Sequence, residues 1–164
     1  MKRIITYIFT IIISFSVCSC TQYSNDFDLK KDTFNINKVS FDKLNQYLLE
    51  QFSNIENSEL NFTFSVSEET GEIEKLYSSY SHEYIYLDED ITELFTNVKN
   101  SFTYDFSIVS ITSTRISYGG EGNEMFVYSL DGKKPKYFWA DNKDAAFSSY
   151  SLDNNWYYLF LKQR

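Results

Sequence analysis

Cysteine, histidine, proline and glycine are all scarce in this chain of 164 residues, and each shortage excludes a class of structure. The chain has two cysteines, one histidine, one proline and five glycines. Both cysteines, Cys18 and Cys20, lie near the amino terminus. The remaining chain therefore forms no disulfide, and its fold must be stable through its core alone.

The shortage of histidine and cysteine leaves few residues for catalysis or metal binding. The single histidine, His82, lies between two β-rich segments, where a lone histidine is more often a solvated turn residue. There is no G-x-S-x-G elbow and no calcium-loop pattern, and Asp141–Asp144 carries a lysine that would oppose a cation. We therefore predict no metal, no cofactor and no enzymatic activity. A carboxylate pair of the glycosidase kind stays open, because 23 acidic residues always offer some pair.

Basic residues are also in the minority, since 15 lysines and arginines face 23 acidic residues for a net charge of −8. Nucleic acid and anionic lipid headgroups both require a basic face, so neither is an expected partner. A basic protein partner is compatible with this charge. Solubility is the plainer explanation of the acidity.

The amino terminus carries the pattern of a secretory signal peptide. Lys2 and Arg3 precede the apolar, uncharged run 4–17. That run is shorter than the roughly 18 apolar residues that a transmembrane helix needs. We expect residues 1–19 to be the signal peptide, which leaves a plain secretory signal or an uncleaved anchor as the alternatives.

The end of the run, Val17-Cys18-Ser19-Cys20, resembles the lipobox of bacterial lipoproteins. The resemblance implies cleavage before Cys20, lipid on its thiol and attachment to a membrane through that N-terminal lipid. Cys18 in the variable position departs from the usual pattern. Thr21 is not the aspartate that retains many such proteins in the inner membrane, which implies the outer membrane in a host with two membranes. Cleavage would remove two basic and no acidic residues, changing the net charge from −8 to −10.

Residues 20–39 are polar and without periodicity, which predicts a tether, and residues 40–164 have the length of one domain. Two helices are expected in this domain. One carries an apolar stripe from Phe41 to Ile55 with Ser40 as its N-cap, and one runs through Ile91 to Phe102 with a capping box at Asp90 and Glu93. The other segments alternate or are β-rich and predict strands at 60–66, 73–80, 84–87, 104–116, 125–130, 136–140 and 156–161.

This order predicts an α+β domain, with two helices packed on one face of a curved antiparallel sheet of about six strands. Glu69-Thr70-Gly71 and Asp131-Gly132 are expected to be turns, the second within a hairpin. A helix followed by a meander occurs twice. In this element order the chain resembles cystatin-like and tandem helix-meander inhibitor folds, a likeness that says little about function.

Two regions are candidates for contact with a partner. The glycine-rich loop 119–124 contains Glu121 and Glu124, and it lacks the Lys-Ser/Thr of a phosphate loop. The second region contains Tyr80, Tyr84 and Tyr86, because aromatic rings with polar tips suit recognition. An idle connector is the alternative for the loop. Packing in the core or on the sheet is the alternative for the tyrosines, and codon bias can explain the 14 tyrosines and 15 phenylalanines.

Taken together, these patterns favour a lipoprotein of the cell envelope with a non-enzymatic binding domain, such as an inhibitor or immunity-type protein that neutralises a basic partner. Two other classes stay open. One is a carboxylate-dependent enzyme acting on cell-wall glycan, and the other is a structural envelope protein.

Overall fold

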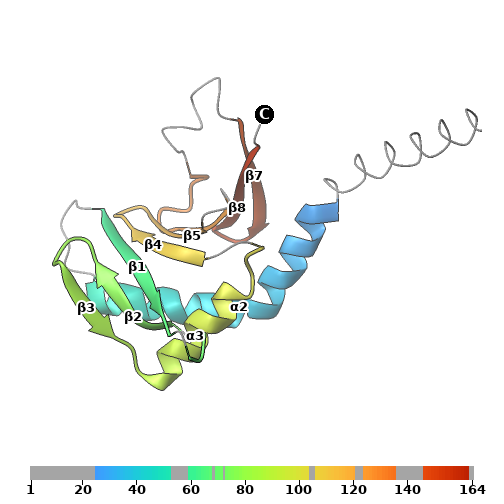
Figure 1. Ribbon diagram of the computed structural model, residues 1–164. Coiled ribbons are helices and arrows are strands. Elements are labelled where there is room, and N and C mark those ends of the chain that lie inside the picture. Colours follow the sequence, from blue (N-terminus) through green and yellow to red (C-terminus); the bar gives the residue numbers. More distant parts are fainter. Residues whose placement is uncertain are drawn as a thin grey trace, which may run out of the picture.

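The structure, a computed structural model, describes residues 25–52, 59–67, 69–71, 73–103, 106–120, 124–135 and 146–162. These residues form an α+β fold of two helices and an open antiparallel sheet of eight strands, two more than expected (Figure 1). The elements in chain order are α2 (Asn25–Phe52), β1 (Leu60–Val66), β2 (Ile73–Ser78), β3 (Glu83–Tyr86), α3 (Glu89–Lys99), β4 (Phe106–Ile111), β5 (Arg115–Gly120), β6 (Glu124–Ser129), β7 (Ala146–Asp153) and β8 (Trp156–Lys162).

The sheet contains two meanders that meet at its centre, and the hairpin of β7 and β8 extends it beyond β6. The strand order is β3-β2-β1-β4-β5-β6-β8-β7, and every neighbouring pair is antiparallel. Thus α2 precedes the meander β1–β3 and α3 precedes the meander β4–β6, while the β1–β4 pair joins them. Within the described residues, β3 and β7 are the two edges of this sheet.

Helix α2 begins 15 residues before the predicted start at Ser40, so the prediction of a tether was wrong from Asn25 onward. Phe34 is fully buried, and Ser40 lies inside the helix rather than at its cap. Phe27 and Phe34 continue the stripe of Phe41 and Leu48 at a spacing of seven residues, or about two turns. A stripe with one apolar residue every two turns is too sparse to predict a helix by periodicity. The segment is helical because tertiary packing stabilises it.

Helix α3 is where the sequence placed it, but its cap is two residues earlier. The Asp88 carboxylate accepts a hydrogen bond from the backbone N–H of Ile91 at 2.9 Å, which makes Asp88 the N-cap in place of Asp90. Asp90 falls within the first turn, where an acidic residue still favours the helix dipole. Phe95 and Val98 are the buried residues of the helix.

Three strand predictions need correction, for different physical reasons. The segment 104–116 is no single strand, because the Thr112 hydroxyl accepts from the N–H groups of Thr114 and Arg115 and turns the chain between β4 and β5. The edge strand β7 was missed because its sequence is rich in serine. Asp131-Gly132 forms no hairpin with a next strand, since β5 and β8 occupy both sides of β6. The strand expected at 136–140 lies outside the described residues.

The core between helices and sheet is dense in aromatic rings. The Phe41 ring lies 5.2 Å from the Tyr118 ring and 5.1 Å from the Trp156 ring, centroid to centroid. Phe34 and Phe126 pack in the same cluster, and all five side chains are essentially excluded from water. Burial, with the charge of Asp42 as a smaller cause, holds the pKa of the Tyr118 hydroxyl well above its usual value. Core packing therefore accounts for much of the aromatic content.

Candidate functional site

Glu124, proposed from the sequence as a surface contact, is buried in the structure and belongs to an internal polar network. Its carboxylate lies 3.0 Å from Lys30 Nζ, and the two side chains are 1 % and 5 % exposed. It also accepts hydrogen bonds from the backbone N–H of Thr103 and the hydroxyl of Tyr158. The prediction for Glu124 was therefore wrong, because the first residue of β6 points its side chain inward toward α2. Glu121 lies outside the described residues.

The three predicted tyrosines, Tyr80, Tyr84 and Tyr86, are exposed at one end of the sheet, at 66 %, 55 % and 77 %. Tyr77 of β2 faces Tyr84 of β3 across the strand pair, and their ring centroids are 5.2 Å apart. Tyr80 lies in the turn between these two strands. We call these four residues the tyrosine surface.

The tyrosine surface continues inward along the sheet on the same face. Opposed residues in a sheet share a face, and the register aligns Tyr84, Tyr77, Thr63 and Ile108 across β3, β2, β1 and β4. Ile108 is 43 % exposed. The row that begins at the edge strand therefore reaches the centre of the sheet with an exposed apolar side chain.

Two polar side chains set the electrostatics of the tyrosine surface. Lys75 Nζ lies 4.7 Å from the ring centroid of Tyr84 and 5.9 Å from that of Tyr86, within the range of a cation–π contact. His82 is exposed in the turn with a left-handed φ of 57°, and its Nδ1 lies 3.1 Å from the hydroxyl of Tyr77. The expectation that His82 is a turn residue is confirmed.

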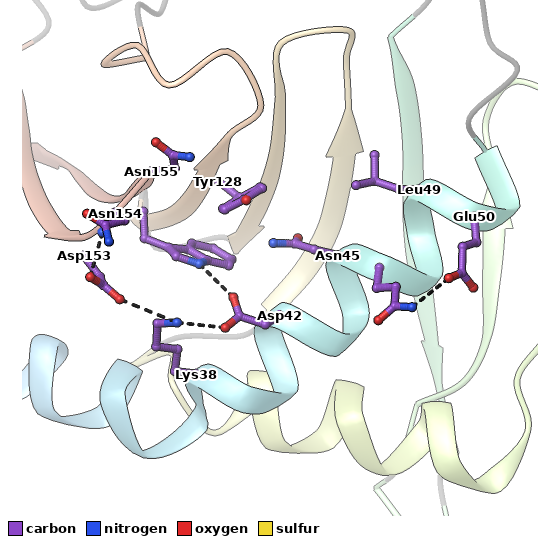
Figure 2. Close-up of a pocket in the computed structure, with 11 residues that line it drawn as sticks. Lys38, Asp42, Asn45, Leu49, Glu50, Tyr128, Asp153, Asn154 and Asn155 are labelled. Carbon is purple, nitrogen blue, oxygen red and sulfur yellow. Dashed lines mark hydrogen bonds and ion pairs between the residues drawn. The ribbon is translucent and has the colours of Figure 1, made fainter.

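A pocket that no sequence pattern indicated lies between α2 and the β7–β8 turn. Figure 2 shows that side chains of the helix and of the turn point into one space, which has a volume of about 720 Å³. The residues that line it are Lys38, Asp42, Asn45, Gln46, Leu49, Glu50, Tyr128, Asp153, Asn154, Asn155 and Trp156.

A chain of polar contacts crosses the mouth of this pocket. Lys38 Nζ lies 2.8 Å from a carboxylate oxygen of Asp42 and 3.5 Å from one of Asp153 (Figure 2). The hydrogen bond to Asp42 is the largest cause that raises the pKa of Lys38 above its usual value. The other oxygen of Asp42 accepts from the indole Nε1–H of Trp156 at 3.1 Å. The contact between Asp42 and Trp156 joins residues 114 positions apart, so no local pattern could reveal it.

Asn45 forms the inner wall of the pocket and has an unpaired donor. Its side-chain oxygen accepts from the buried hydroxyl of Tyr118 at 2.7 Å, and the residue is 5 % exposed. Among the described residues, none accepts a hydrogen bond from its Nδ2. In Figure 2 this nitrogen points away from α2, on the side where Tyr128 lies. A buried amide without an acceptor costs about 1–3 kcal/mol.

The described residues contain no group of three or more histidine, cysteine, aspartate or glutamate side chains that could hold a metal ion. None of the helices in the described part of the chain is long and apolar enough to span a membrane. Asp141–Asp144, Cys18 and Cys20 lie outside the described residues.

Comparisons with protein-family models, with curated proteins and with solved structures found no match. The tyrosine surface and the pocket are therefore the features from which a function can be inferred.

Proposed function

We propose that the protein is a lipid-anchored, non-enzymatic binding protein of the cell envelope, whose tyrosine surface contacts a basic protein partner. The lipid would be on Cys20, as the lipobox resemblance implies. The protein would be located in the outer membrane in a host with two membranes. The observation that carries the proposal is the pair of exposed tyrosines, Tyr84 and Tyr86, on one face of strand β3, with Tyr80 exposed in the turn before it.

Tyrosine rings in this position are suited to a protein interface. A tyrosine offers a large, stiff contact area with a polar tip, and tyrosine is enriched among residues that dominate binding energy. The row from Tyr84 to Ile108 adds apolar area next to these rings. A partner that covered this face would exclude water from Tyr84 and Tyr86, which are now more than half exposed.

Charge favours a basic partner. The chain has a net charge of −8, which would accelerate association with a basic protein by electrostatic steering. Lys75 already lies over the rings of Tyr84 and Tyr86, so these faces accept a cation. A lysine or arginine of a partner could take the same kind of position. An inhibitor or immunity-type protein would work in this way, and the tandem helix-meander order adds only a likeness of fold.

The second candidate function is that of a carboxylate-dependent enzyme acting on glycan. The carboxylates that line the pocket are the observation that favours it. Asp42 and Asp153 both contact Lys38 Nζ, at 2.8 and 3.5 Å, so their nearest oxygens are separated by no more than the sum of these distances. This upper bound permits the separation of roughly 5–5.5 Å found between the carboxylates of retaining glycosidases. Yet these side chains are 46 % and 42 % exposed, whereas a general acid is normally kept protonated in an apolar pocket. We therefore prefer binding over catalysis.

The test compares partner capture by membranes that carry the full chain with capture by variants. Tyr84→Ala/Tyr86→Ala should weaken the affinity for a captured basic protein by about 30-fold or more, the effect of losing about 2 kcal/mol. Lys75→Ala should strengthen the complex, because it exposes the ring faces to the partner's cations. Leu29→Ser/Ile36→Ser is the matched control, since both side chains are exposed on α2, at 63 % and 80 %.

Capture that is equal for wild type and the double tyrosine variant would contradict the proposal, whatever protein is captured. An acidic partner, or association that does not slow as salt rises, would contradict its electrostatic part. Release of reducing sugar from cell-wall glycan that is lost in Asp42→Asn would support the enzyme instead.

A further inference from the structure

We infer that the pocket between α2 and the β7–β8 turn is a binding site for a neutral saccharide, held by the Asn45 amide and the carboxylates around it. This site is separate from the tyrosine surface, and the inference does not depend on the proposed partner. Three properties of the pocket support a saccharide as the ligand: an unpaired hydrogen-bond donor, the charge of the lining residues and the shape.

The unpaired donor is the first argument. Asn45 Nδ2 needs an acceptor, and the described protein residues provide none. The Oδ1 atom of the same amide accepts from the hydroxyl of Tyr118. With the two ends of the amide exchanged, Nδ2 would donate to the Tyr118 oxygen, and the hydroxyl hydrogen of Tyr118 would lose this acceptor. A ligand oxygen at this position, from a hydroxyl or an acetamido carbonyl, would accept a hydrogen bond from this donor.

Charge is the second argument, because it removes the other ligand classes. Three carboxylates, from Asp42, Glu50 and Asp153, line the pocket against the single ammonium of Lys38, so an anion would be repelled. A lysine or arginine side chain would match the carboxylates but has no acceptor for Asn45 Nδ2. Hydroxyl groups donate to carboxylates and accept from amides, and a neutral saccharide therefore fits both.

Shape is the third argument. A volume of about 720 Å³ lies in the range of small-molecule sites, which is about 300–1,000 Å³. Leu49 and Tyr128 contribute half-buried apolar surface against which the C–H face of a sugar ring can pack. Trp156 is 1 % exposed, so it supports the wall from behind rather than stacking on the ligand.

Binding requires a small movement of the wall. Asn45 Nδ2 is itself shielded from water, so a ligand oxygen can reach it only when a neighbouring side chain turns aside. Tyr128 and Leu49 are half-buried, line the same pocket and pack against the core, with the Tyr128 ring 5.1 Å from that of Trp156, so one of them must give up part of this packing when the ligand binds. The indole N–H of Trp156, bonded to Asp42 beside them, would report the change.

The experiment titrates the full chain, in a detergent without a sugar headgroup, with cellobiose, maltose, lactose and N,N′-diacetylchitobiose. We expect at least one of these to bind with a Kd of about 1 mM or tighter and to shift the Trp156 indole N–H resonance. The chain has two tryptophans, so Trp139→Phe assigns the resonance. Asn45→Asp keeps the acceptor for Tyr118 and removes the donor, and it should weaken binding at least about tenfold.

A second variant keeps the test independent of the fold around Asn45. Gln46 is exposed at the pocket, and Gln46→Trp should block it with at least about a tenfold loss of affinity. Lys43→Trp is the control, since Lys43 is exposed on the same helix but does not line the pocket. The inference is overturned if none of the four sugars binds, if Gln46→Trp binds as well as Lys43→Trp, or if L-arginine methyl ester occupies the pocket and the sugars do not.

Discussion

Lys30 and Glu124 form a buried ion pair. Of the polar contacts in this structure, it is the one whose disruption by a single substitution should lower the free energy of unfolding most. Both charges are almost fully removed from water, and their mutual attraction at 3.0 Å offsets a desolvation penalty of several kcal/mol per ion. The network is completed by the Ser101 carbonyl, which accepts from Lys30 Nζ at 3.1 Å, and by Thr103 and Tyr158 on the carboxylate. The pair thus holds the first half of α2 against strand β6 of the sheet.

We predict that Glu124→Gln lowers the free energy of unfolding by about 3–5 kcal/mol, because it leaves the Lys30 ammonium buried without its counter-charge. Urea denaturation measures the effect. The control is Lys38→Met, which removes an ammonium from exposed pairs and should cost less than about 1 kcal/mol. Equal costs for the two variants would show that the Lys30–Glu124 pair is not buried in solution. Lys30→Met/Glu124→Leu should recover much of the loss, since no unpaired charge remains.

At the scale of elements, the first half of α2 belongs to the folded domain. Phe34 packs on Phe41, Phe126 and Trp156 with ring centroids 5.2 to 5.9 Å apart. These contacts connect a segment without a clear helical pattern to β6 and β8. The segment is helical because the sheet buries its sparse aromatic residues, since helical stability in proteins comes mainly from packing.

We predict that Phe34→Ala destabilises the protein by about 3–5 kcal/mol, as expected for an aromatic ring lost from a closed core. Ile36→Ala, two residues away and 80 % exposed, should change stability by no more than about 0.5 kcal/mol. Thermal or urea unfolding of both variants provides the measurement. A small effect of Phe34→Ala would mean that residues before Ser40 are a tether after all.

At the scale of the whole molecule, the early start of helix α2 shortens the expected distance between the anchor at Cys20 and the folded domain. Only four residues separate Cys20 from Asn25, the first residue of the helix. Four residues span at most about 14 Å, whereas the predicted tether of about 20 residues averaged near 25 Å. If Cys20 carries lipid, the domain lies closer to the headgroups than the sequence suggested.

We predict that Cys20→Ser abolishes incorporation of a fatty-acid probe and leaves an uncleaved or soluble precursor. Cys18→Ser should label as the wild type does, because the cleavage position lies before Cys20. Labelling followed by gel electrophoresis separates the two variants. Undiminished labelling of Cys20→Ser would exclude the lipoprotein interpretation and leave a plain secretory signal or an uncleaved anchor.

Local sequence was sufficient for those features that depend on local chemistry. The α+β class, helix α3, the turn at Gly71 with its left-handed φ of 72° and most strands follow from periodicity, caps and turn residues. The exposed tyrosines were also found, because they cluster within seven residues. Sequence by itself could not say whether those rings faced the core or the solvent.

Tertiary structure alone decided the features that join distant segments. The pocket brings Asp42 and Asn45 of α2 together with Asp153 of β7 and Trp156 of β8. Glu124 is buried because Lys30 of that same helix pairs with it. The early start of α2 belongs here too, since Phe27 and Phe34 define a helix only when the sheet covers them. The physical reason is common to all three. Burial and charge pairing depend on distances in space, and a linear pattern contains only distances along the chain.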